Sequence, residues 1–395
     1  MSRRAVASIT FVGRTTAAIR GAPPLDNLTH ALAGAAIAKA GADRATPLAT
    51  ATLVVAANAP DIDMVSYMAG PYAALAFRRG ITHGWPALIV LPFLVAGAVL
   101  LWDRRVRRRR NPDAEPSRAG PLLALAVVGV LTHPTLDWMN TYGMRWGLPF
   151  DGTWTYGDAL FIIDPWIWLA LAGAVVLSSD WSRAWLTSWT VLAVATSVLV
   201  LTGVPAARVP WLVGLAAVTG LFLTHRPATA RARRATAGAA TAAVCAYIVA
   251  LVAAGGVARD HVAEAAAARG LVVRDVMVAP LRGNPFVSDV EVVTDEAYVP
   301  GVHRWVGNTV ELYPDRAAPL LDAPEDLPAA EAQRVLARAR EHSDVRHYLV
   351  WSRYPYARIE ADGAGWQVVY ADARYDDAPE GGSLSGVRAR VASTP

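Results

Sequence analysis

Three histidines and four aspartates lie in short polar segments of an otherwise apolar chain. These residues are His30, Asp61, Asp63, His83, His133, Asp137 and Asp164. Imidazole and carboxylate groups are the usual ligands of divalent metal ions in proteins. A single ionised group in a membrane helix costs about 2.5–3.5 kcal/mol on insertion scales, so we expect this many to be paired, ligated or close to an aqueous face.

The spacing of two pairs favours metal binding. His133 and Asp137 are four residues apart in a segment predicted to be helical, so they share one face. Both can then bind one metal, or Asp137 can orient the imidazole, and a buried hydrogen-bonded pair is the alternative. Asp61 and Asp63 follow Pro60 at the end of an apolar run. Two such carboxylates suit a hard or borderline cation, with a helix N-cap plus a surface charge as the alternative.

The remaining candidates are less distinctive. His83 follows Arg78 and Arg79, and we expect one of these arginines, Arg79 by preference, to hold an anionic substrate group such as a phosphate. Snorkelling of both arginines at the membrane surface is the alternative. His30 alone would usually be structural, but the other His and Asp motifs in the chain make it a candidate ligand. Asp164 precedes a proline, an arrangement typical of a helix N-cap, which would explain it without a metal.

Composition predicts a membrane protein. The chain has 395 residues, 54% of them hydrophobic, and a mean hydropathy of +0.30. Long apolar runs predict transmembrane helices at residues 86–102, 120–138, 162–178, 184–203, 209–224 and 236–257. Two shorter runs, 28–40 and 47–59, predict a helical hairpin packed inside the bundle. The single cysteine, Cys245, excludes an internal disulfide and a thiolate metal site.

Arginine placement predicts the orientation. Residues 103–110 (DRRVRRRR) and 225–234 (HRPATARARR) each separate two apolar runs, which is typical of cytoplasmic loops. Nucleic-acid binding is the alternative, but no aromatic residues are interleaved with these arginines, so we expect no nucleic-acid partner. With both loops in the cytoplasm, all seven candidate residues fall at the outer membrane face. The lipid bilayer is then the main partner.

From residue 258 charges become frequent and long apolar runs end. We predict a helix continuing out of the membrane at 260–269, a second helix at 327–341, and strands at 271–279, 287–294, 345–352, 356–361 and 366–372. The fold class is therefore mainly α: a polytopic transmembrane helical bundle followed by a small α+β extracytoplasmic domain. The predicted division is an N-terminal extension (1–25, with the true start near Leu25), a transmembrane domain (26–257), the outer domain (258–380) and a flexible tail (381–395).

The motifs together resemble a family of bacterial inner-membrane metal-dependent hydrolases of the YbcI/YdjM type. The family pattern Met-Asp-x-x-Thr-His corresponds to Asp26, Thr29 and His30 in this chain. The later family motifs correspond to Pro60–Asp63, Arg79–His83, His133 with Asp137, and Asp158–Pro165. Residues 366–375 resemble the end of the C-terminal domain found in longer members. A distant similarity of this family to zinc-dependent phospholipase C and single-strand nucleases implies a phosphoester substrate by analogy.

The leading hypothesis is a metal-dependent hydrolase of the bacterial plasma membrane. The seven candidate residues would supply the metal ligands and the groups that support them, with zinc as the first choice and manganese or magnesium as alternatives. The metal would activate water, Asp61 or Asp63 would act as the base, and a membrane lipid or another phosphoester would be the substrate. The alternatives are an ion transporter and a non-catalytic protein with a structural metal.

Overall fold

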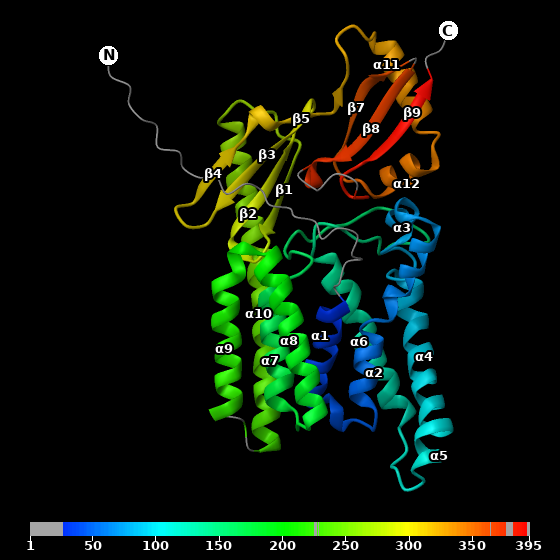
Figure 1. The fold of residues 1–395 in the computed structure, drawn as a ribbon, viewed down its shortest axis with the longest axis vertical. Helices are drawn as coiled ribbons and strands as arrows, with labels where there is room; N and C mark the ends of the chain where they lie inside the picture. The colour runs from blue at the N-terminus through cyan, green and yellow to red at the C-terminus, as the bar shows by residue number, and fades with distance from the viewer. Residues whose placement is uncertain (1–26, 225–226, 228, 364, 377–381, 393–395) are drawn as a thin grey trace. The chain divides into compact units, whose positions relative to one another are not determined.

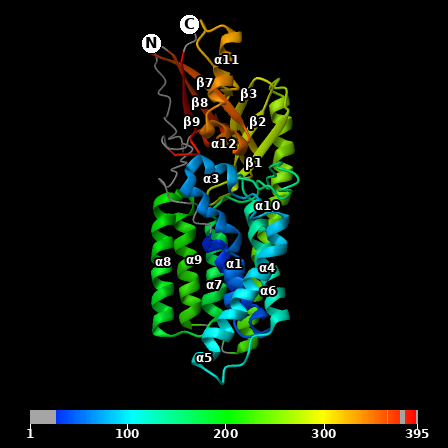
Figure 2. The same ribbon diagram turned by 90° about the vertical axis from the view of Figure 1, so that its right-hand side faces the viewer.

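The computed structural model describes residues 27–224, 227, 229–363, 365–376 and 382–392 (Figures 1 and 2). These residues form two compact units, 27–319 and 320–392. The predicted N-terminal extension, the proposed start near Leu25 and the motif residue Asp26 lie outside the described residues.

The first unit begins with a helical bundle, which confirms the predicted fold class. Its α-helices are α1 (Asn27–Lys39), α2 (Ala49–Ala56), α3 (Pro71–Phe77), α4 (Trp85–Trp102), α5 (Arg108–Arg110), α6 (Ala119–Trp138), α7 (Pro165–Ser178), α8 (Arg183–Gly203), α9 (Arg208–Thr224) and α10 (Ala230–Ala267). The other helical segments are the 3-10 helices η1 (Ala42–Arg44), η2 (Ala59–Ala69) and η4 (Pro205–Ala207) and the π-helical turn η3 (Asp103–Arg107).

Five helical stretches among the described residues are long and apolar enough to cross a bilayer. They are Trp85–Arg110, Ala119–Trp138, Arg183–Gly203, Pro205–Thr224 and Ala230–Ala267. The transmembrane helix predicted at 162–178 is shorter in the structure, where α7 has only 14 residues. At 1.5 Å per residue α7 is about 21 Å long, less than the roughly 30 Å of the hydrocarbon layer.

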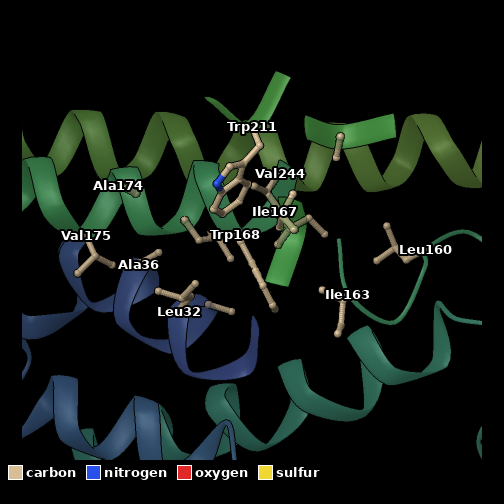
Figure 3. Close-up of a cluster of buried hydrophobic side chains, with 14 of the residues drawn as sticks. Leu32, Ala36, Leu160, Ile163, Ile167, Trp168, Ala174, Val175, Trp211 and Val244 are labelled. Atoms are coloured by element: carbon tan, nitrogen blue, oxygen red, sulfur yellow. The ribbon is translucent and has the colours of Figure 1, made fainter. Parts of the chain in front are cut away.

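Helix α7 forms the centre of the bundle. Trp168 and Ile167 are almost fully buried among side chains of α1, α9 and α10, as Figure 3 shows. The indole nitrogen of Trp168 donates a hydrogen bond of 2.8 Å to the hydroxyl of Thr29 on α1. Because a buried indole N–H needs an acceptor, this bond fixes α1 against α7 in one rotational setting.

Two glycines let α1, α2 and α6 approach closely. A Cβ atom at Gly34 of α1 would lie 2.8 Å from the carbonyl oxygen of Leu53, and one at Gly129 of α6 would lie 2.6 Å from the Cβ of Ala56. Neither position has space for a side chain, so the backbones of the helices that carry two of the predicted histidines pack directly on α2. This contact brings α1 and α6 to the same end of α2.

Helix α10 serves both the bundle and the first β-sheet. At 1.5 Å per residue its 38 residues extend about 57 Å, nearly twice the hydrocarbon thickness. Its last turns bury Val262 and Ala266 against Val278 and Val290 of the sheet. The predicted domain boundary after residue 257 therefore falls inside one continuous helix, and the predicted helical continuation at 260–269 forms the last part of α10.

The first sheet is antiparallel, with the order β1-β2-β3-β4 and with β5 also paired to β3. Its strands are β1 (Asp275–Leu281), β2 (Asn284–Val293), β3 (Ala297–Arg304), β4 (Thr309–Leu312) and β5 (Ala318–Pro319), and the 3-10 helix η5 (Pro314–Arg316) precedes β5. The predicted strands 271–279 and 287–294 correspond to β1 and β2. The other three strands were not predicted.

The second unit is a four-stranded sheet with two helices. It contains β6 (Leu321–Asp322), α11 (Ala329–Ala339), α12 (Ser343–Trp351), β7 (Pro355–Asp362), β8 (Gly365–Asp372), the 3-10 helix η6 (Ala373–Tyr375) and β9 (Val387–Ala392). The strand order is β6-β7-β8-β9, parallel between β6 and β7 and antiparallel elsewhere. The helical bundle is therefore followed by an α+β region, as predicted, and this region contains two small sheets.

Two predictions for this unit were wrong. Residues 345–352 form most of helix α12, because Val345, Tyr348 and Trp351 are buried at every third position. The β-propensity of valine and aromatic residues obscured this helical spacing. The tail expected to be flexible from residue 381 contains strand β9, in which Val387 and Val391 alternate inward and pair with β8.

The contact at Gly129 is testable. We expect Gly129→Val to destabilise the bundle by about 1–3 kcal/mol, because the added methyl groups overlap α2. Gly120→Val is the matched control in the same helix, since a Cβ there meets nothing within 4 Å. Thermal unfolding of the detergent-purified variants would measure the difference. Equal melting temperatures would show that α6 does not pack on α2 at this glycine.

Candidate metal centre

Four of the seven predicted residues converge at one end of the bundle. Asp61, His83, His133 and Asp137 each offer one ligand atom, and these atoms all lie within 4.8 Å of one another. All four side chains are buried, and neither imidazole has any exposed surface. They come from η2, from the turn before α4 and from the last two turns of α6. Within the described part of the chain, this is the one group of His, Cys, Asp and Glu side chains arranged to share an ion.

Helix α6 and the end of α2 set the orientation of His133. Its Nδ1 atom lies 2.7 Å from the carbonyl oxygen of Ala57. A carbonyl oxygen can only accept, so Nδ1 carries the hydrogen and Nε2 keeps a lone pair. Asp137, one helical turn later, places its Oδ2 atom 3.6 Å from this Nε2 atom.

Asp63 sets the orientation of His83. Its Oδ2 atom lies 3.3 Å from Nδ1 of His83 and accepts hydrogen bonds from the backbone N–H of Arg79 and the hydroxyl of Thr82. Burial alone would raise the pKa of Asp63, but His83, the charge of Arg78 and the bond from Arg79 lower it to about 2. An ionised carboxylate only accepts, so His83 donates through Nδ1 and its Nε2 atom carries a lone pair when the ring is neutral.

The two Nε2 atoms of His83 and His133 therefore face each other at 3.1 Å. Two lone pairs at this distance repel unless a proton or a metal cation lies between them. Burial lowers the pKa of His83, but hydrogen bonds to Asp137 and Asp63 raise it above its usual value overall. A proton and a metal ion thus compete for the same nitrogen.

Two buried arginines balance part of the negative charge. Arg78 lies 3.0 Å from Asp61, and Arg79 lies 2.8 Å from Asp137. Arg79 also donates a 2.8 Å hydrogen bond to the side-chain oxygen of Asn140. Three buried carboxylates against two guanidinium groups leave one negative charge when the imidazoles are neutral. This excess favours a cation in the cluster.

His30 lies beside the cluster. Its ring stacks on that of His133 with 3.7 Å between the ring centres, and its Nε2 atom lies 3.5 Å from Oδ1 of Asp137. The predicted ligand is therefore in contact with two members of the group without being one of the four. Its position is suited to orienting Asp137, as supporting groups around metal ligands commonly do.

Asp164 is placed apart from these contacts. Its Oδ1 atom accepts hydrogen bonds from the backbone N–H groups of Trp166 (2.8 Å) and Ile167 (3.1 Å), which caps α7. Its Oδ2 atom accepts a 3.0 Å bond from the hydroxyl of Tyr247 on α10. The N-cap alternative drawn from the following proline explains these contacts without a metal.

Sequence analysis did not find Asn140. Its side-chain oxygen accepts hydrogen bonds from Arg79 and from the backbone N–H of Tyr142, and it is almost fully buried. It lies three residues after Asp137, which is one helical turn, so the spacing was the available signal. A search for polar residues one turn beyond each candidate ligand would have included it.

A small cleft with space for about one water molecule lies between α1, α6 and α7. It is lined by Thr29, Leu136, Asn140, Leu160, Phe161, Ile162, Asp164 and Ile167. Most of the lining is apolar, and Asn140 connects it to the cluster through Arg79.

Apolar helical spans around a buried His–Asp group define a polytopic membrane protein with a candidate metal site. Residues 25–209 match the model of the YdjM inner membrane protein family. The resemblance noted in the sequence is thereby confirmed for this part, and the region beyond residue 209 is unassigned. No curated protein and no solved structure matches the chain.

The role of Asp164 can be separated from metal binding. We expect Asp164→Ala to cost about 1 kcal/mol of stability through loss of the N-cap, whereas Asp164→Asn keeps a capping oxygen and most of that stability. Metal content should match that of the wild type in both variants. Thermal unfolding and mass spectrometry of the purified proteins would measure the two effects. Loss of metal in Asp164→Asn would instead make Asp164 a ligand.

Proposed function

We propose that this protein is a membrane-bound, metal-dependent hydrolase that uses Asp61, His83, His133 and Asp137 as its metal ligands. The observation that carries the proposal is the pair of Nε2 atoms that face each other at 3.1 Å while both Nδ1 atoms have acceptors. Two nitrogen and two oxygen donors suit zinc best, and the carboxylate oxygens also suit manganese or magnesium.

We place the site at the extracytoplasmic face. The arginine-rich elements η3 and α5 lie at one end of the bundle and α3 lies at the opposite end (Figure 1). The 3-10 helix η2 packs against both α3 and α4. The positive-inside rule assigns the arginine-rich end to the cytoplasm. The cluster, which includes Asp61 of η2 and His83 before α4, then lies outside, and the two sheets follow on the same side if α10 leaves the membrane there.

The side chains of the site have distinct tasks. When bound, a divalent metal supplies a Lewis acid that activates water and polarises the bond to be cleaved. Asp61 is the best-placed base, because its Oδ1 atom binds Arg78 while its Oδ2 atom accepts no hydrogen bond from the described residues. Both oxygens of Asp63 accept hydrogen bonds, so Asp63 orients His83. Arg79 holds Asp137 in the same way.

The substrate class we propose is a phosphoester, with a membrane lipid as the preferred source. The position of the cluster in a bundle with five candidate membrane spans favours a lipid over a soluble metabolite. The resemblance to zinc-dependent phosphoesterases points to the same bond type by analogy. Arg78 and Arg79 are both paired with carboxylates of the cluster, so the metal would be the main anion-binding group.

One observation favours a non-catalytic metal site as the second candidate. The group already offers four protein donors, all buried, and structural zinc sites are closed tetrahedra of this kind. A catalytic site needs a coordination position for water. The metal of a structural site would exchange slowly, and its loss would lower stability without any hydrolysis to measure.

Metal content is the first test. We expect detergent-purified wild-type protein to contain stoichiometric zinc or manganese by mass spectrometry, and His133→Ala to have lost it, because the variant removes one of the two facing nitrogens. His342→Ala, which changes an exposed histidine of the second unit, is the matched control and should keep its metal. A folded wild type that takes up no metal after supplementation would refute the metal centre.

Hydrolysis is the second test. We expect metal-loaded protein to hydrolyse bis(p-nitrophenyl) phosphate or phosphatidylglycerol. At equal metal content, we expect Asp61→Asn to be slower by about 100- to 10,000-fold, because an amide cannot accept the proton. Asp326→Asn, an exposed change in the second unit, is the control. Rates unaffected by Asp61→Asn would exclude Asp61 as the base. Metal-loaded protein without any hydrolysis would favour the structural site.

A further inference from the structure

The 3-10 helix η2 presents opposite chemistry on its two sides. In a 3-10 helix residues three apart eclipse one another, so Ile62, Val65 and Met68 form a single row. Their exposed fractions are 65%, 60% and 88%. Asp61 and Asp63, on the other rows, are buried in the cluster. The helix thus turns its charges into the protein and its largest apolar side chains outward.

The surroundings of this row are also apolar. Between residues 62 and 77 the only charged side chain is the buried Asp63. Phe77 and Ile81, which follow along the chain, are about half exposed. Soluble surfaces rarely expose large apolar patches without charged residues among them, and such patches mark interaction or membrane sites. Water is therefore an unfavourable environment for this face.

The apolar row continues into a surface that faces lipid. Trp85, Ile89 and Phe93 are exposed at four-residue spacing on α4, which is one of the candidate membrane spans. The 3-10 helix η2 packs against this helix, and α3, labelled in Figures 1 and 2, packs against η2. Tyr67, partly exposed on η2, and Trp85 are residue types that gather at the membrane–water interface.

We infer that residues 59–77 form an interfacial segment whose outward row of Ile62, Val65 and Met68 inserts into the headgroup–acyl boundary of the bilayer. The partner is the lipid of the leaflet that surrounds this end of α4. The amphipathic pattern is that of helices lying in a membrane surface, with the polar side covered by protein instead of water. The inference holds whether the metal centre is catalytic or structural. If it is catalytic, a lipid substrate would reach Asp61 from the leaflet.

Depth-dependent fluorescence quenching tests this placement in the full chain. Cys245, the single native cysteine, is replaced by alanine, and Met68→Cys is labelled with an environment-sensitive fluorophore. The protein is reconstituted into vesicles of phosphatidylcholine and phosphatidylglycerol in equal parts. Quenching by a nitroxide attached near the top of the lipid acyl chain is compared with quenching by aqueous iodide.

We expect lipid nitroxide to quench the Met68→Cys label several-fold more than iodide does. Ile89→Cys on α4 is the lipid-facing control, and Asp326→Cys in the second unit is the water-facing control. Iodide quenching like that of Asp326→Cys would overturn the inference, because the row would then face water. Protection from both quenchers would overturn it as well, because another part of the protein would then cover the row.

Discussion

The arrangement of this protein depends on two imidazole nitrogens that point at each other. Nε2 of His83 and Nε2 of His133 are 3.1 Å apart, and each ring is fixed from behind by an acceptor at Nδ1, Asp63 in one case and the carbonyl of Ala57 in the other. Neither ring can rotate away without leaving a buried polar atom unpaired, which costs about 1–3 kcal/mol. The contacts on the far side of each ring therefore keep the two Nε2 atoms facing each other, where a proton or a metal ion can lie between them.

The bundle supports this constraint by close backbone packing rather than by large side chains. His133 reaches the carbonyl of Ala57 because Gly129, one turn earlier on α6, lets the helix lie directly against α2. Helix α7, too short to span the hydrocarbon layer, fills the centre and holds α1 through the bond between Trp168 and Thr29. The pairing of arginines with the buried carboxylates then removes most of the charge that would otherwise oppose folding in a membrane.

The sequence allowed much of the site to be predicted because its residues follow simple spacing rules. His133 and Asp137 lie one turn apart on α6, and that spacing survives in any helix. The sequence could not show which of the seven candidates are ligands, because their roles depend on contacts between separate segments. Asp63 supports His83, which follows it by twenty residues, and Asp164 caps α7. The β-propensity of valine and tyrosine led to a wrong strand prediction at 345–352, where burial of every third residue instead favours helix α12.

The 3-10 form of η2 connects the candidate metal site to the apolar surface row of Ile62, Val65 and Met68. At about 120° per residue, Asp61 and Asp63 occupy two rows facing the protein, and Ile62, Val65 and Met68 keep the third row throughout. At the roughly 100° per residue of an α-helix, that third row would drift by about 60° every three residues, and the two carboxylates would point about 160° apart. Runs of 3-10 helix longer than about four residues are uncommon, and η2 has 11. Its geometry is the one that lets a single segment bind the cluster on one side and lipid on the other.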